Sequence, residues 1–205
     1  MNGSGSDRDA ERVLSRVSAL PLSRGDGLPD APAHDRNVRI VLVRHGPAEE
    51  RDPVRWPNDD RRPLTSKGRS QTRRAAKGLA RVTPPVHRMA SSAAERAVDT
   101  ARMVRQALDG APKLETWPEL APGNLPQVIL NRLRRSVRPG QDFLLVGHEP
   151  TLAEFVGLAL VGDGVPVVHL TKGGAACLEF SHGVKPGAGR LVWLLTRKQL
   201  ADGSS

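Results

Sequence analysis

The feature that most constrains this 205-residue chain is an alternation, beginning at residue 38, of short apolar runs with segments of helical periodicity. The first run, Val38-Arg39-Ile40-Val41-Leu42-Val43, is almost entirely apolar or β-branched, which is typical of a strand covered on both faces. Residues 93–108 give the clearest helical pattern, because small and apolar residues recur there every three or four positions. This alternation predicts a three-layer α/β/α domain with a mainly parallel central sheet.

The same patterns give the expected element boundaries. A helix capped by Thr65 or Ser66 is expected to run to about Val82. Further strands are expected at 87–90, 142–146, 175–180 and 191–195, and further helices at 125–137 and 150–161. We expect the folded domain to span 38–198, preceded by a flexible, disordered leader (1–37) rich in Pro, Gly and Asp and followed by a flexible tail (199–205).

Charge and composition restrict the partners. The chain has 31 Lys and Arg against 22 Asp and Glu, a formal charge of +9, and residues 51–105 alone hold fourteen basic and five acidic residues. An anionic partner is therefore expected. Nucleic acid is disfavoured, because the chain has only six aromatic residues, no Tyr among them, and no groove-reading motif. No apolar run approaches the roughly 18 to 20 residues that span a bilayer, so we expect a soluble protein without a membrane partner.

The single cysteine, Cys177, cannot form an internal disulfide and disfavours a zinc site, so a reducing, cytoplasmic location is expected. The sequence makes no prediction of the oligomeric state.

Chemically versatile residues follow three of the expected strands. Arg44 and His45 follow the first strand, Arg96 comes shortly after Ser91-Ser92, and His148 follows the run that ends at Gly147. In open α/β sheets, ligands bind beyond the carboxyl ends of the strands. These two histidines and two arginines are therefore predicted to meet at one edge of the sheet.

A phosphoryl group suits such a cluster. Guanidinium groups match its three oxygens with paired, charge-assisted hydrogen bonds, and Arg44 and Arg96 are the candidates. A neutral imidazole attacks phosphorus when its other ring nitrogen donates to a fixed acceptor, and His45 is placed for this, with Gly46 allowing close approach of the backbone. The remaining histidines are interpreted as ordinary surface or core residues: His34, His87, His169 and His182.

Two competing chemistries are weaker. The acids near His45 and His148 lack familiar metal-ligand spacing, so no metal is expected. A serine nucleophile is disfavoured, because neither Ser91 nor Ser92 lies in a Gly-x-Ser-x-Gly turn.

Four motifs together resemble a known family. They are Leu42-Val43-Arg44-His45-Gly46, Arg62-Pro63-Leu64-Thr65-Ser66-Lys67-Gly68, Ser91-Ser92-Ala93-Ala94-Glu95-Arg96-Ala97-Val98-Asp99-Thr100-Ala101 and Gly147-His148-Glu149-Pro150-Thr151-Leu152. In this order, over about residues 38–196, they resemble the histidine phosphatase superfamily, whose hallmark Arg-His-Gly follows the first strand. The short length and Pro118-Glu119-Leu120-Ala121-Pro122 are most similar to the small SixA-type phosphohistidine phosphatases.

The resemblance implies a phosphoglycerate mutase-like fold and assigns roles. It implies that His45 is the nucleophile, that Arg44, Arg96 and Gly46 bind phosphate, and that His148 binds phosphate and donates a proton. No metal or organic cofactor is implied. Two departures lie off the chemical positions: Ala93 stands where a proline is common, and Asp99 where a glutamine is common.

One absence bears on the substrate. Many metabolite phosphatases of the superfamily carry a catalytic glutamate at the position that aligns with Pro122. An alcohol leaving group needs such an acid, worth about 10² to 10⁴ in rate, whereas an imidazole departs more readily. A phosphorylated protein carrying phosphohistidine is therefore the expected substrate. Four carboxylates stay open as acids, although each is first interpreted as a solvated loop residue: Glu119, Asp59, Asp60 and Glu49. The alternatives are a phosphatase of a small phosphorylated metabolite or polyphosphate and a non-catalytic phosphate-binding module.

Overall fold

The computed structural model describes residues 37–203, so the expected leader lies outside the described residues except for Asn37. The strands are β1 (Val38–Arg44), β2 (Arg88–Ser91), β3 (Leu114–Thr116), β4 (Phe143–Gly147), β5 (Ala175–Phe180) and β6 (Gly189–Leu195). The helices are α2 (Ser66–Val82), α3 (Glu95–Ala107), α4 (Pro126–Ser136), α5 (Thr151–Val161) and α6 (Arg197–Asp202), with short 3-10 turns η2 (Asp59–Arg61) and η3 (Pro118–Leu120).

The strands form one sheet in the order β3-β2-β4-β1-β5-β6. The first four strands in this order are mutually parallel, whereas β5 is antiparallel to β1 and β6 is antiparallel to β5. The expected α/β fold with a mainly parallel sheet is confirmed, and the sheet as a whole is mixed. Strand β5 is antiparallel to β1 because the chain after α5 returns to the edge where β1 ends and starts β5 from there. At this edge the Arg44 amide donates to the Gly174 carbonyl oxygen at 3.1 Å.

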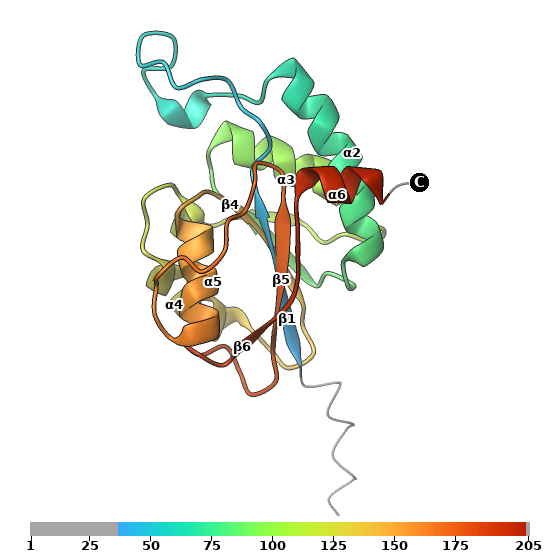
Figure 1. Cartoon of the computed structure of the whole chain (residues 1–205), viewed down its shortest axis with the longest axis vertical. Helices are drawn as coiled ribbons and strands as arrows, with labels where there is room; N and C mark the ends of the chain where they lie inside the picture. Colours follow the sequence, from blue (N-terminus) through green and yellow to red (C-terminus); the bar gives the residue numbers. More distant parts are fainter. Residues whose placement is uncertain (1–36, 204–205) are drawn as a thin grey trace, which may run out of the picture. The chain divides into compact units, whose positions relative to one another are not determined.

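Helices cover both faces of the sheet (Figure 1). Alternate residues of β1 point to opposite faces, as a strand requires. Val41 and Val43 pack with the inner sides of α2, α3 and α6, whereas Ile40 and Leu42 pack with α4 and α5. This double covering explains why β1 and β4 are apolar at nearly every position.

Helix α6 differs from expectation, since the sequence predicts a flexible tail at 199–205 and the helix occupies the first part of that range. Thr196 and Gln199 form a capping box, in which the Thr196 Oγ1 accepts from the Gln199 amide at 3.2 Å. Leu200 is only 3% exposed and joins the core beneath α2. A Cβ at Gly78 of α2 would lie 1.7 Å from the Leu200 carbonyl oxygen, so this glycine permits the close packing. The folded part therefore extends past residue 198.

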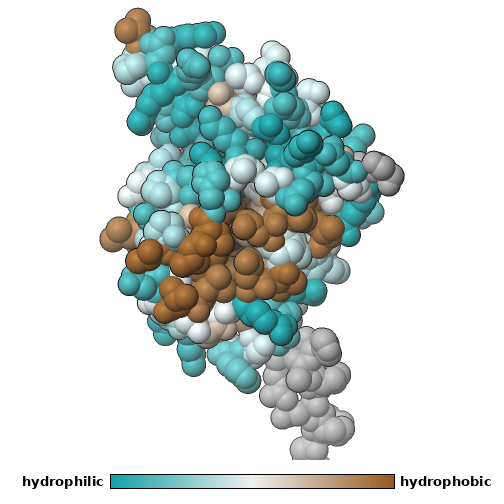
Figure 2. All heavy atoms as spheres, in the orientation of Figure 1, coloured by the Kyte–Doolittle hydropathy of each residue, from teal (hydrophilic) through white to brown (hydrophobic). Residues whose placement is uncertain are grey.

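The surface is divided by polarity. Figure 2 shows hydrophilic side chains over the segment that leads to α2, and a hydrophobic area over α5 and β6. Exposed hydrophobic residues of those two elements include Val161, Val192 and Leu194. Among the helices of residues 37–203, none combines the length and the hydropathy needed to cross a membrane. The hydrophilic part of this face lies at the end of the sheet where the parallel strands finish.

Candidate active site

Two histidines meet where β1 and β4 end. Arg44, the last residue of β1, pairs with Gly147, the last residue of β4. The residues that follow, His45 and His148, therefore leave the sheet at the same level. The His45 amide donates to the Gly147 carbonyl oxygen at 3.1 Å. The two ring centroids are 5.0 Å apart, with the planes inclined by 54°. The structure thus brings together the two histidines that the sequence predicts to meet.

The protonation of His45 is defined by its contacts. Its side chain is 7% exposed, and Nδ1 lies 2.7 Å from the Gly46 carbonyl oxygen. Because a carbonyl oxygen only accepts, Nδ1 carries the proton and Nε2 keeps its lone pair. Burial, reinforced by the charges of Arg96, Arg44 and Arg62, lowers the pKa of His45 to about 4, against the opposing effect of the Gly46 hydrogen bond. The ring is therefore neutral at pH 7.

Gly46 is held between two helices. Its amide donates to Thr100 Oγ1 of α3 at 3.0 Å. A Cβ at Gly46 would lie 2.1 Å from Thr72 Oγ1 of α2, closer than any side chain permits. The turn that carries His45 therefore requires a glycine for close approach rather than for an unusual φ angle.

The segment Arg62 to Gly68 fixes the chain that leaves His45. The Thr65 amide donates to the Pro47 carbonyl oxygen at 3.2 Å, and the Glu49 amide donates to the Pro63 carbonyl oxygen at 3.0 Å. A Cβ at Gly68 would lie 2.0 Å from the Pro47 carbonyl oxygen. This motif acts as a backbone clamp on the turn after β1.

Three buried nitrogen atoms at the site have no hydrogen-bond partner among residues 37–203: Arg44 Nε, Arg96 Nε and His148 Nε2. Arg44 uses Nη1 to donate to the Leu170 carbonyl oxygen at 2.7 Å, and Arg96, which is 2% exposed, uses Nη1 to donate to the Asp59 carbonyl oxygen at 2.7 Å. A buried donor left without a partner costs about 1 to 3 kcal/mol. An oxyanion accepts from both arginine nitrogens, and also from His148 Nε2 when that nitrogen carries the ring proton.

His148 is also held neutral. Burial lowers its pKa to about 3, and the positive charge on a protonated His45, together with Arg96 and Arg62, acts in the same direction, whereas Asp59 opposes it. The charges of Arg96 and Arg62 thus act on both histidines, so these groups form one electrostatic unit.

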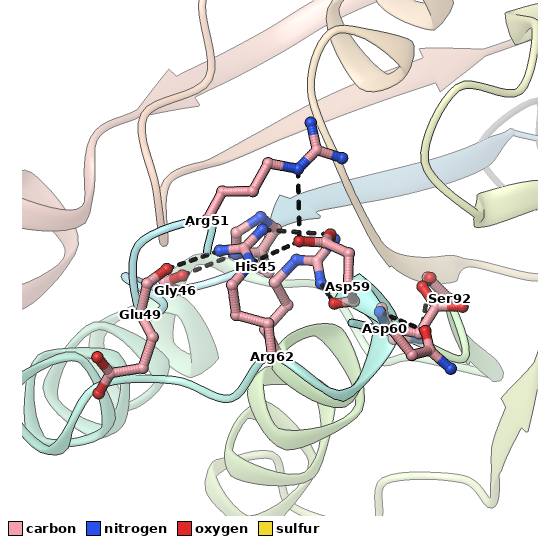
Figure 3. A network of polar contacts seen from close by, with 11 residues as sticks. His45, Gly46, Glu49, Arg51, Asp59, Asp60, Arg62 and Ser92 are labelled. Carbon is pink, nitrogen blue, oxygen red and sulfur yellow. Dashed lines mark hydrogen bonds and ion pairs between the residues drawn. The ribbon is translucent and has the colours of Figure 1, made fainter. Parts of the chain in front are cut away.

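Arg62 belongs to this unit, although the sequence analysis gave it no role. Its Nε donates to Asp59 Oδ1 at 2.8 Å, and its Nη1 donates to the Glu49 carbonyl oxygen at 2.8 Å. Arg96 Nη2 contacts Asp59 Oδ2 at 3.0 Å. Figure 3 shows Arg62 and Asp59 beside His45. The Arg-Pro-Leu-Thr motif is the sequence feature that could have indicated a role for Arg62, as a third cation near the phosphate site.

The four carboxylates considered as acids take different places. The hydrogen bond from Arg62 holds the pKa of Asp59 below its ordinary value, so Asp59 is an anion at pH 7. Asp60 is exposed, and Glu49 forms an ion pair with Arg55 at 3.7 Å. Glu119 lies in η3, and its Oε2 is buried without a hydrogen-bond partner in the part of the chain that the structure describes.

Three residues that the sequence disfavours as catalytic groups, Ser91, Ser92 and His87, lie in the core or form structural contacts. Ser91 ends β2 in the core, and Ser92 Oγ accepts from the Ala94 amide at 3.2 Å. His87 Nδ1 accepts from the Asp142 amide at 3.0 Å, at the opposite end of β4 from His148. His34 lies outside the described residues. Within residues 37–203, no group of three or more His, Cys, Asp or Glu side chains is arranged to hold a metal ion.

Residues 40–125 match the family model of the histidine phosphatase superfamily, branch 1. The matched part contains three of the four residues that meet at this edge of the sheet: Arg44, His45 and Arg96. Over these residues the chain is similar to the histidine phosphatase superfamily.

Within that class, the chain is similar to the protein histidine phosphatase SixA, solved in complex with tungstate. That structure is 23% identical, covers 79% of this chain and 99% of its own, and has a TM-score of 0.66. Phosphoglycerate mutase from Bacillus anthracis is 13% identical and covers 85% of this chain and 100% of its own, with a TM-score of 0.59. These likenesses confirm the expected phosphoglycerate mutase-like fold. An uncharacterized protein of Picosynechococcus sp. is 29% identical over 155 residues, which is 75% of this chain and 88% of the relative.

Proposed function

We propose that this protein is a hydrolase of the histidine phosphatase superfamily that removes phosphoryl groups through a phosphorylated His45, and that its substrate is phosphohistidine on a protein. The observation that carries the proposal is the contact between His45 Nδ1 and the Gly46 carbonyl oxygen, which leaves Nε2 unprotonated in a buried site beside His148. A neutral imidazole with a fixed tautomer is a competent nucleophile toward phosphorus.

The reaction has two displacements. The lone pair of His45 Nε2 attacks phosphorus, the bond from phosphorus to the leaving group breaks, and the leaving group takes that electron pair. Water then attacks the phosphorylated His45, the bond from phosphorus to Nε2 breaks, and inorganic phosphate leaves. Arg44, Arg96 and His148 bind the three phosphoryl oxygens in both steps, and their buried nitrogens without partners support this role.

His148 also handles a proton. Its pKa of about 3 describes a ring surrounded by guanidinium charges, and a bound phosphoryl dianion attracts a proton and raises that value. His148 thus donates a hydrogen bond to the phosphoryl group and a proton toward the departing nitrogen. A histidine leaving group suits this arrangement, because it needs less acid assistance than an alcohol.

The missing carboxylic acid supports phosphohistidine as the substrate. Pro122 stands where the resemblance places the glutamate of metabolite phosphatases. Asp59 is held as an anion by Arg62 and has no proton to donate at neutral pH. Both observations favour a leaving group that departs without a strong general acid.

A second candidate is a phosphatase of small phosphorylated metabolites, and Glu119 is the observation that favours it. Its Oε2 is buried, and no described residue forms a hydrogen bond with it. The segment after η3 reaches the start of α5, where Thr151 Oγ1 donates to the Asn124 carbonyl oxygen at 2.9 Å, three residues past His148. A Glu119 carboxyl group carried toward the leaving group by this segment would supply the acid that an ester needs.

A substrate panel tests the two candidates. We expect kcat/KM to be highest for a phosphohistidine peptide and lower for a sugar phosphate, a phosphoserine peptide and polyphosphate. Wild-type protein pulsed with labelled substrate is expected to yield an acid-labile phosphoryl adduct, and His45→Ala is expected to fold without turnover. A preference for phosphate esters that Glu119→Gln abolishes would establish the second candidate. Tight phosphate binding without hydrolysis of any substrate would indicate a non-catalytic binding module.

A further inference from the structure

Asp59 contacts two arginines of the site through its carboxylate and its backbone carbonyl group. Its Oδ1 accepts from Arg62 Nε at 2.8 Å, and its Oδ2 contacts Arg96 Nη2 at 3.0 Å. Its backbone carbonyl oxygen accepts from Arg96 Nη1 at 2.7 Å. Figure 3 shows the Asp59 carboxylate beside Arg62, with Arg51 above it.

These contacts determine how Arg96 faces the phosphate site. Both terminal nitrogens of the Arg96 guanidinium contact Asp59, so the plane of this group is fixed from two sides. Its Nε is buried and has no hydrogen-bond partner within residues 37–203. A phosphoryl oxygen therefore finds a guanidinium whose direction is set in advance, and this lowers the cost of ordering it on binding.

The charge of Asp59 matters as much as its geometry. Arg62 and Arg96 repel each other, since the charge of Arg62 acts to lower the pKa of Arg96 while Asp59 acts to raise it. Asp59 is the carboxylate in direct contact with both. Glu149 acts electrostatically on Arg44, and the exposed Asp60 acts on Arg96 only through longer-range attraction.

We propose that Asp59 is a positioning and specificity-determining residue: it aims Arg96 at the phosphoryl group and holds Arg62 beside it, and its negative charge disfavours substrates that carry a second phosphate next to the first. The inference rests on the proposed function of the site around His45. It gives Asp59 a role other than that of the proton donor considered from the sequence. The substrate class that fits is a single phosphoryl group on a carrier without adjacent phosphates, such as a protein side chain.

Binding to the full chain tests the proposal without requiring turnover. The measured quantity is the Kd of inorganic phosphate divided by the Kd of tripolyphosphate, from calorimetry at fixed low salt. Asp59→Asn removes the charge and keeps an acceptor, and we expect it to raise this ratio about tenfold, because one unit charge next to a polyanion in a partly solvated site has an effect of this order. Asp59→Glu, which keeps the charge, is expected to restore the ratio to near the wild-type value.

Asp60→Asn is the matched control, because it removes the same charge from the neighbouring, exposed residue. An unchanged ratio in Asp59→Asn, or an equal rise in both variants, would overturn the proposal. If Asp59→Asn is unfolded by thermal melting at the assay temperature, Asp59→Ser gives the same test. A failure of the proposed function gives a different result: the wild-type protein shows no turnover, while the ratio of the two Kd values still shifts in Asp59→Asn. Turnover in wild type with an unshifted ratio in Asp59→Asn would reject only the role of Asp59.

Discussion

At the scale of the residue, burial keeps the His45 ring neutral, as its proposed role as nucleophile requires. The side chain leaves β1 into a site lined by Arg44 and Arg96, where desolvation and positive charge both oppose protonation and lower its pKa to about 4. A ring with this pKa stays unprotonated far below neutral pH. Under the proposed function, the guanidinium groups that would bind a phosphoryl anion therefore also keep the proposed attacking nitrogen unprotonated.

This predicts an unusual acid limb in the pH profile. Because kcat/KM reports the free enzyme, we expect it to stay level as pH falls through 6.5 and to decline only near pH 4, where His45 becomes protonated. The measurement is a kcat/KM profile with a substrate whose own ionisation is known. A decline centred at the ordinary histidine pKa of about 6.5 would contradict the assigned protonation state.

Gly46 permits a test by compensation. We expect Gly46→Ala to lower the free energy of unfolding by about 1 to 3 kcal/mol and to reduce turnover strongly, because the new Cβ meets Thr72 Oγ1 at 2.1 Å and must displace the turn that carries His45. Adding Thr72→Ala removes that atom. Urea denaturation and kcat of the double variant should then recover relative to the sum of the single variants. Strictly additive losses would show that the clash is not the cause.

Sequence reasoning succeeds for some residues of the site and fails for others for a physical reason. Arg44, His45 and His148 each follow a buried strand directly, so strand prediction already places them at one edge. Asp59 and Arg62 lie in a segment with no apolar period. Their positions depend on how that segment folds back across Arg96, and no local pattern encodes this.

At the scale of the element, the length and burial of a strand or helix decide whether the sequence pattern predicts it. Strands β1, β4 and β5 have continuous apolar runs and were predicted within two residues at each end. Strand β3 is three residues long and α6 six, too short to give a period of their own. Helix α6 forms because its cap and the packing of Leu200 against α2 stabilise it, which is a tertiary effect.

The packing of α6 on α2 predicts that Gly78→Ala is destabilising. In an exposed helix this change would stabilise by about 1 kcal/mol through helix propensity. Here the added Cβ would lie 1.7 Å from the Leu200 carbonyl oxygen, so we expect a net loss of about 1 to 3 kcal/mol as α6 moves away. Thermal melting measures the effect, with Lys77→Ala at the neighbouring exposed position as the control. A gain in Tm for Gly78→Ala would mean that α6 does not pack as described.

At the scale of the whole molecule, the positive charge is distributed unevenly. Residues 51–105 carry fourteen basic and five acidic residues, and part of this excess lies on the exposed segment that leads from His45 to α2. Arg55 and Arg61 are exposed there, whereas Arg134 and Arg135 are exposed on α4, which covers the other face of the sheet (Figure 1). Exposed charges of this kind act on the rate of encounter more than on the chemical step.

This distribution predicts how salt affects the reaction. We expect kcat/KM for an anionic phosphorylated peptide to fall about tenfold as ionic strength rises from about 0.01 M to 0.5 M, with kcat nearly unchanged, because the Debye length shrinks from about 30 Å to a few Å. Replacing Arg55 and Arg61 by Gln should reduce kcat/KM at low salt and flatten its salt dependence. The same change at Arg134 and Arg135 alters the net charge equally but on the other face, so it should leave the dependence as in wild type. Equal effects of the two pairs would mean that net charge, rather than its position near His45, attracts the substrate.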